Sequence, residues 1–114
     1  MNIKKIYRNI YVEAGADFSD TVNVIDYKTQ TPINVSGYTD LVGQVKKTYL
    51  SENFLEFEFE LDGNSKIIFK LDSAETGQLK PGRYVYDITI ELNGNINKLI
   101  EGILEIYPTA SIYV

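Results

Sequence analysis

Three groups of side chains in the sequence belong to residue types that can do chemistry, and the first is a set of aspartates. Asp17, Asp20 and Asp26 are close in sequence, and calcium prefers carboxylate and carbonyl oxygens. Their spacing does not match an EF-hand loop, and the nearest glycine, Gly15, falls in the wrong place for one. We therefore interpret the three residues as solvated turn and strand-edge positions.

The second group is a row of alternating glutamates, Glu56, Glu58 and Glu60. Glycosidases use a pair of carboxylates, but those lie on separate elements across a cleft. Three glutamates in a row on one strand instead predict a charged outer face. Such a face also discourages contact with the sheets of other molecules.

The third group lies in LKPGRYVYDI, residues 79–88. In a strand that begins at Gly82, side chains alternate between two faces, so Tyr84 and Tyr86 share one face while Arg83 and Asp87 share the other. We predict that the tyrosines fill a core with one polar end at the surface; an aromatic platform for sugars is the alternative. The charged residues are expected to form weak surface pairs. Their candidate partners are Lys98, Glu101 and Glu105.

The usual catalytic groups are missing from the sequence. There is no histidine and no cysteine, which removes the commonest general base, the commonest transition-metal ligand and all thiol chemistry. A serine or threonine nucleophile needs an activating base, and no nucleophile elbow, phosphate-binding loop or dinucleotide fingerprint occurs. We predict a protein that is not an enzyme and has no cofactor and no metal.

Size and charge narrow the partners. The 114 residues suit a single domain, 1–114, and the net charge is −5. Without basic patches, nucleic acid and anionic membrane surfaces are not expected as partners. No apolar run approaches the roughly 20 residues of a membrane span. The start, MNIKKIYRNI, is too polar for a signal peptide, so we expect synthesis without Sec-type export.

Apolar residues alternate along most of the chain and predict about seven strands. Asp62-Gly63 and Asn93-Gly94 predict two-residue hairpin turns. Ser73 is expected to cap a single helical turn within residues 73–79. The predicted strands lie within residues 6–15, 17–26, 39–50, 54–61, 65–71, 82–92 and 96–107. This pattern predicts an all-β fold, an immunoglobulin-like antiparallel β-sandwich of about seven strands with one short helical turn; a small barrel is the alternative.

Two glycines lie inside predicted strands. Gly102 is expected to leave room for a bulky partner or to mark a bulge. Gly43 lies in residues 39–50, where both faces carry apolar residues, so the sequence leaves open which face meets the core.

An ordered set of short motifs covers most of the chain. The motifs are Asp17-Phe18, Val35-Ser36-Gly37-Tyr38-Thr39, Thr76-Gly77-Gln78-Leu79, Pro81 to Ile88, and Glu101-Gly102. In this order they resemble the N-terminal domain of phage upper-baseplate proteins. They are also similar to small virion structural proteins of contractile-tailed bacteriophages, including cyanophages.

The resemblance implies an Ig-like β-sandwich without catalytic residues that sits on a virion and is made in the host cytoplasm. It implies other virion proteins as partners, either capsid or neck, tail and baseplate subunits, and multiple copies per particle. A module that binds host-surface glycans is the alternative function.

Both ends of the chain are candidate contact surfaces for such partners. Terminal strands can add to the sheet edge of a neighbouring molecule, and exposed apolar ends often mark interaction sites. The alternative is that both ends complete the sheets of this domain itself. The candidate contact residues are Ile6, Tyr7, Ile10 and Tyr11 near the start, and Ile112, Tyr113 and Val114 at the end.

Overall fold

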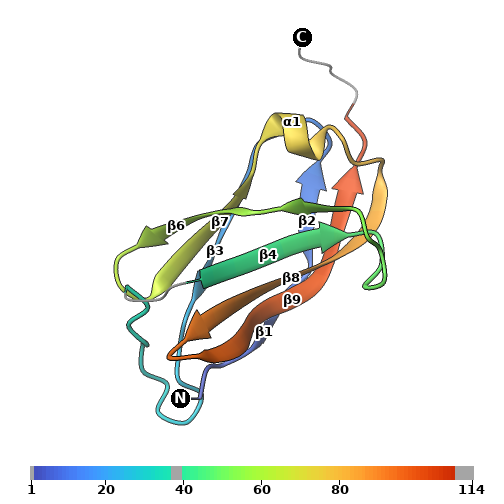
Figure 1. Cartoon of the computed structure of the whole chain (residues 1–114). Helices are drawn as coiled ribbons and strands as arrows, with labels where there is room; N and C mark the ends of the chain where they lie inside the picture. Colours follow the sequence, from blue (N-terminus) through green and yellow to red (C-terminus); the bar gives the residue numbers. More distant parts are fainter. Residues whose placement is uncertain (1, 37–39, 110–114) are drawn as a thin grey trace.

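Two β-sheets pack face to face in the computed structural model, which describes residues 2–36 and 40–109 (Figure 1). The large sheet contains β1 (Ile6–Tyr7), β2 (Ile10–Glu13), β4 (Asp40–Lys46), β5 (Phe54–Glu56), β8 (Gly82–Leu92) and β9 (Asn95–Tyr107). The small sheet contains β3 (Phe18–Asn23), β6 (Glu58–Asp62) and β7 (Lys66–Leu71). A short helix, α1 (Ser73–Thr76), follows β7.

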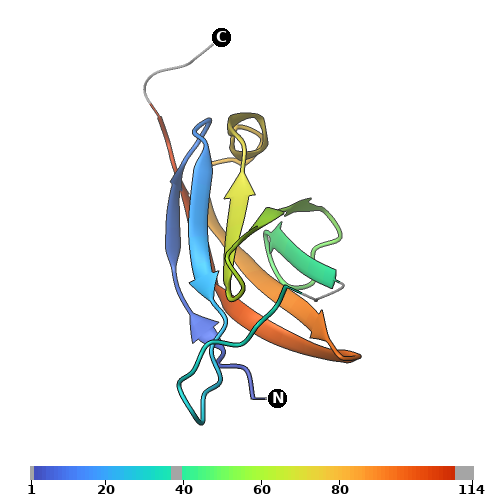
Figure 2. The same ribbon diagram turned by 90° about the vertical axis from the view of Figure 1, so that its left-hand side faces the viewer.

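The strand order confirms the predicted immunoglobulin-like sandwich. The large sheet has the order β1-β9-β8-β4-β5, with β2 also on β9, and the small sheet has the order β3-β7-β6. In immunoglobulin terms, β4, β8 and β9 correspond to strands C, F and G, and β3, β7 and β6 to B, E and D. The first strands, β1 and β2, run parallel to β9, while the other pairs are antiparallel. Figure 2 shows β2 and β3 toward one side of the sandwich and β4 toward the other.

One of the two predicted hairpin turns is confirmed, and the other is one residue longer. Asn93 and Gly94 join β8 to β9 with φ values of 52° and 80°, as a type I′ turn requires. Between β6 and β7 the loop has three residues, because Asp62 pairs with Lys66. The carbonyl of the third loop residue, Ser65, accepts a hydrogen bond from the backbone of the segment after β3, and this contact holds the longer loop.

The first predicted strand is interrupted at Arg8 and Asn9, opposite Gly102. The register continues through the break, since Ile6 pairs with Ile100 and Ile10 with Leu104. A Cβ atom on Gly102 would lie 2.1 Å from the Arg8 carbonyl oxygen, so the chain bows over a position that only glycine fits. The Asn9 side chain then accepts from the Ile103 N–H at 3.1 Å. Gly102 therefore makes room for a neighbour, as predicted, but that neighbour is the backbone carbonyl of Arg8 and not a bulky side chain.

The segment predicted as one strand over 54–61 changes sheets at Phe57. Its first part, β5, pairs with β4, whereas β6 pairs with β7. At the crossing point the Phe57 N–H donates to the Gly43 carbonyl. A Cβ on Gly43 would approach the rings of Phe57 and Phe59 to 3.0 and 2.7 Å. Gly43 therefore faces the core and admits the crossing phenylalanine, which settles the face that the sequence left open.

Aromatic rings tie the two sheets together at the centre of the core. The Phe57 ring meets the rings of Phe69, from the small sheet, and Tyr86, from the large sheet, with centroids 5.2 and 6.0 Å apart. The Tyr84 hydroxyl donates to the Lys80 carbonyl at 2.7 Å, which is the tyrosine corner of immunoglobulin-like folds. Tyr86 therefore occupies the place, two residues later, that a disulfide cysteine holds in antibody domains.

The helical turn is confirmed, but Asp72 caps it instead of Ser73. The Asp72 carboxylate accepts from the Glu75 N–H, and the Glu75 carboxylate accepts from the Asp72 N–H. This reciprocal pair is a capping box. The buried Thr76 hydroxyl donates to the Ala16 carbonyl at 2.8 Å, so α1 closes the end of the sandwich near the β2–β3 turn (Figure 1).

Candidate functional site

The outer faces of the two sheets differ in composition. The small sheet presents polar residues, and two ion pairs cross it, Lys70–Glu60 at 2.6 Å and Lys66–Asp62 at 3.8 Å. Its outward positions are Ser19, Thr21, Asn23, Glu58, Glu60, Asp62, Lys66, Lys70 and the half-buried Ile68. Two of the three predicted surface glutamates lie here, while Glu56 lies on the large sheet because the strand changes sheets. The small sheet therefore presents a solvated face.

The large sheet presents aromatic and aliphatic side chains among the charged residues of its outer face. Three tyrosines lie at its β1–β2–β9 side, with 71% of Tyr7, 60% of Tyr11 and 44% of Tyr107 exposed. We call these three residues the tyrosine patch. Val85 and Ile103 pair with each other in the middle of the same face. Further exposed apolar residues on this face are Val42 and Phe54.

The tyrosine patch is held in place by contacts within its own sheet. The rings of Tyr11 and Tyr107 stack with centroids 5.7 Å apart and planes 13° apart. The Tyr107 hydroxyl donates to the Glu105 carboxylate at 3.1 Å, and partial burial together with this bond raises the pKa of Tyr107. The Lys5 ammonium lies 4.8 Å from the centre of the Tyr7 ring. These rings therefore present a preformed surface.

Charged side chains border the tyrosine patch. Glu101 pairs with Lys5 at 2.8 Å and with Lys98 at 2.9 Å. The two ammonium groups hold the pKa of the Glu101 carboxyl below its usual range. As predicted, the charged residues of β8 pair across to β9, with Arg83–Glu105 at 3.7 Å and Asp87–Lys98 at 3.5 Å. An aromatic centre with a charged border is typical of protein interfaces.

The structure separates the predicted contact residues into three groups. Tyr7 and Tyr11 lie on the outer face, as a contact role requires. Ile6 is half-buried and Ile10 is buried in the core, so both help to complete this domain's own sandwich. The predicted contact residues Ile112, Tyr113 and Val114 lie outside the described residues.

The sequence pattern did not identify Tyr107 as part of this surface. Tyr107 follows the inward Ile106, so the alternation along β9 already placed it outward, beside the parallel strand β2. Alternation along the strands puts Tyr7 and Tyr11 on one face of the first strand and Tyr107 on the outward face of β9. Only the parallel pairing of β2 with β9 brings these tyrosines together, and the sequence pattern does not indicate that pairing.

The three aspartates considered as calcium ligands have separate partners. Asp17 accepts from the Ser73 N–H at 2.8 Å, and Asp26 accepts from the Lys28 and Thr29 N–H groups of its own turn; these backbone bonds lower the pKa of Asp26. Asp20 pairs with Arg8 at 3.0 Å. Within residues 2–36 and 40–109, no group of three acidic side chains is arranged to hold a metal ion.

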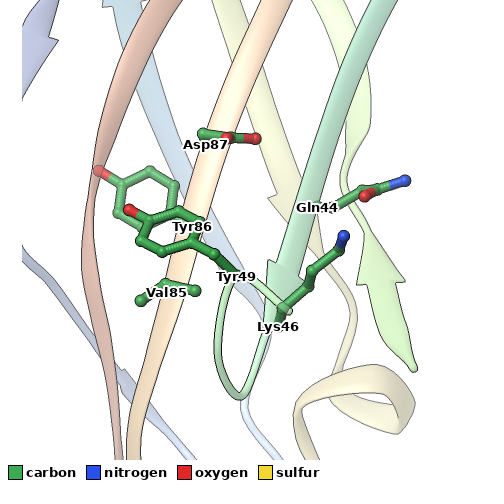
Figure 3. A pocket seen from close by; sticks show the side chains of 6 residues that line it. All are labelled: Gln44, Lys46, Tyr49, Val85, Tyr86 and Asp87. Atoms are coloured by element: carbon green, nitrogen blue, oxygen red, sulfur yellow. The ribbon is translucent and has the colours of Figure 1, made fainter. Parts of the chain in front are cut away.

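A small pocket lies on the β4–β8 side of the same outer face. Tyr49, from the loop after β4, extends its ring across β8 between Val85 and Asp87, and Gln44 and Lys46 project from β4 (Figure 3). The pocket has a volume of about 170 Å³. We call it the Tyr49 pocket.

Comparisons with known proteins support the fold alone. No protein-family model matches the chain, and no curated protein matches its sequence. Among solved structures, InlP of Listeria monocytogenes is similar over 88% of this chain, with a TM-score of 0.50 and 16% sequence identity. The chain spans 26% of the InlP chain.

The described segments contain no helix long and apolar enough to cross a membrane.

Proposed function

We propose that the chain is a non-enzymatic structural module of a bacteriophage virion, and that it binds a neighbouring virion subunit through the tyrosine patch. Two observations support the proposal. The ordered motifs from Asp17-Phe18 to Glu101-Gly102 resemble those of virion β-sandwich domains. The outer face of the large sheet exposes three tyrosines, while the outward positions of the small sheet are polar apart from the half-buried Ile68.

The exposed tyrosines are the observation that carries the proposal. Tyrosine is enriched among the residues that dominate binding energy at interfaces, because it supplies a large contact area with only two rotatable torsions. The stacking of Tyr11 on Tyr107 restricts both rings before any partner arrives, which reduces the entropy lost on binding. Capsid, neck, tail and baseplate subunits are the candidate partners.

A paired substitution tests the proposal. Tyr7→Ser together with Tyr11→Ser removes two rings of the patch without touching the core. We expect the amount of this variant in purified virions to fall about tenfold or more, because two anchor residues are lost. Immunoblotting of purified particles measures the amount.

The matched control is Tyr27→Ser. Tyr27 is 52% exposed, lies in the turn after β3 and does not belong to the outer face of the large sheet. This control should enter particles at the wild-type level. Equal incorporation of the double variant and the wild type would contradict the docking role of the patch, and absence of the wild-type protein from particles would contradict the virion role itself.

A further inference from the structure

The loop between β4 and β5, residues 47–53, presents an apolar side chain to solvent at its tip. The Ser51 N–H donates to the Thr48 carbonyl at 3.1 Å, and the Ser51 hydroxyl accepts from the Thr48 N–H at 3.0 Å. These bonds close a tight turn with Tyr49 and Leu50 at its centre, where small or polar residues are usual. Leu50 is 95% exposed, so its side chain is stabilised by almost no contact within its own domain.

The Tyr49 ring anchors this turn to the large sheet. The ring lies across β8 between Val85 and Asp87, at the Tyr49 pocket of the outer face (Figure 3). Leu50 is therefore the exposed apolar end of an anchored turn. Glu52 follows on the same loop, is exposed and forms no ion pair among the described residues. The loop thus combines an apolar tip with a negative charge.

A second pocket opens beside this loop, on the inner side of the large sheet. Val45 and Tyr84 are buried core residues and Leu55 pairs with Val45, so these three side chains point from the sheet toward the space between the two sheets. Leu79, from the segment between α1 and β8, also lines the pocket. The volume is about 250 Å³, and we call this site the Leu79 pocket. An apolar cavity of about 150 Å³ already holds a ligand as large as benzene, so the Leu79 pocket has room for a leucine side chain.

Basic side chains lie at the rim of the Leu79 pocket. The Lys47 ammonium lies 4.7 Å from the centre of the Tyr84 ring and donates to the Arg83 carbonyl at 3.1 Å, which holds it at the pocket. Lys80, next to Leu79 in the chain, is exposed and belongs to no ion pair within the part of the chain that the structure describes. The loop and the pocket therefore carry opposite charges, although the net charge of the chain is −5.

We propose that the Leu79 pocket receives Leu50 from a second copy of this chain. The loop and the pocket are neighbours, because Lys47 and Asn53 belong to the loop and also line the pocket. Two copies related by a two-fold axis can each place Leu50 in the pocket of the other, and the same arrangement brings Glu52 toward the basic rim. An unrelated partner would fill the pocket but leave Leu50 in water, whereas a second copy covers both.

The oligomeric state of the isolated protein tests the proposal. Because the contact is small, we expect a weak dimer with a dissociation constant of about 100 µM, measured by sedimentation velocity at increasing concentrations. Leu50→Asp should weaken the dimer about tenfold or more, since a charge would have to enter an apolar pocket. Ile96→Asp is the matched control, because Ile96 is 77% exposed at the start of β9, and it should leave the dimer unchanged.

Charge variants and amide chemical shifts assign the contact to the pocket. Lys80→Glu should weaken the dimer, whereas Lys28→Glu should not, although it makes the same change of net charge at an exposed lysine in the turn after β3. The amides of Gln78 and Leu79 should shift with protein concentration in the wild type and should not shift in Leu50→Asp.

The proposal is overturned if the wild type is monomeric at about 1 mM, or if either control variant weakens the dimer as much as its partner does. It is also overturned if the concentration-dependent shifts are confined to the tyrosine patch. The docking proposal is tested separately, on particles.

Discussion

The hydroxyl of Tyr86 joins the first strands of the chain to the core. It donates to the Arg8 carbonyl at 2.5 Å, at the point where the chain bows over Gly102. The Arg8 guanidinium in turn binds Asp20 at 3.0 Å and the Thr21 carbonyl at 2.8 Å, both on β3. This chain of contacts connects the edges of the two sheets.

The titration of Tyr86 should therefore appear in the stability of the protein at high pH. Burial raises the pKa of Tyr86 to about 12, whereas the pKa of a tyrosine in an unfolded chain is about 10. Between these values the unfolded chain binds fewer protons, so the free energy of unfolding falls as the pH rises. The contribution of Tyr86 is complete below pH 10 and is lost as the pH rises through about 12.

Tyr86→Phe provides the control for this pH dependence. We expect the variant to be less stable at pH 7 by about 1 kcal/mol, because the Arg8 carbonyl loses its donor. Its stability should also fall less steeply above pH 10 than that of the wild type. Urea unfolding at several pH values measures both effects, and an unchanged slope in the variant would contradict the assignment to Tyr86.

Two glycine substitutions distinguish backbone crowding from side-chain crowding. In Gly102→Ala the new methyl group would meet the fixed Arg8 carbonyl, while in Gly43→Ala it would meet the far end of the Phe59 ring. Because a ring can shift more easily than a strand, we expect Gly102→Ala to lose about 1–3 kcal/mol or more and Gly43→Ala to lose less. Chemical denaturation gives the order, and the reverse order would disprove this account of the break in the first strand.

At the scale of the elements, alternation predicted the strands, but it did not predict where two of them break. The β8–β9 hairpin follows from alternating residues and Asn93-Gly94, both of which are local signals. The breaks at Arg8 and Phe57 depend on distant partners, Gly102 and Gly43. A single sequence does not show which distant residues meet, so the two breaks were not predictable from periodicity.

The crossing of the chain between sheets at Phe57 makes this residue central to stability. Its ring is buried between Phe69 and Tyr86, so Phe57→Ala should lower the free energy of unfolding by about 3–5 kcal/mol. Phe54, on β5 in the same segment, is 45% exposed, and Phe54→Ala should change stability by less than about 1 kcal/mol. Calorimetry of both variants measures the two losses of stability. Similar losses would contradict the central role of Phe57.

At the scale of the whole molecule, the sandwich has a polar outer face on the small sheet and exposed tyrosines on the outer face of the large sheet. The sequence predicted the solvated glutamates, two of which lie on the small sheet. It also suggested Tyr7 and Tyr11 as contact residues, but it did not indicate that Tyr107 lies beside them. That contact depends on the parallel pairing of β2 with β9. The proposed docking surface is therefore a product of topology as much as of composition.

The lysines of the two faces allow the docking proposal to be tested directly. Lys5 and Lys98 border the tyrosine patch, while Lys66 and Lys70 lie on the outer face of the small sheet. Amine-reactive cross-linking and mass spectrometry of purified virions would compare the two faces within one experiment. We expect cross-links to other virion subunits from Lys5 or Lys98 and few or none from Lys66 and Lys70. Cross-links from the small-sheet lysines alone, or absence of the protein from the particles, would contradict the docking proposal.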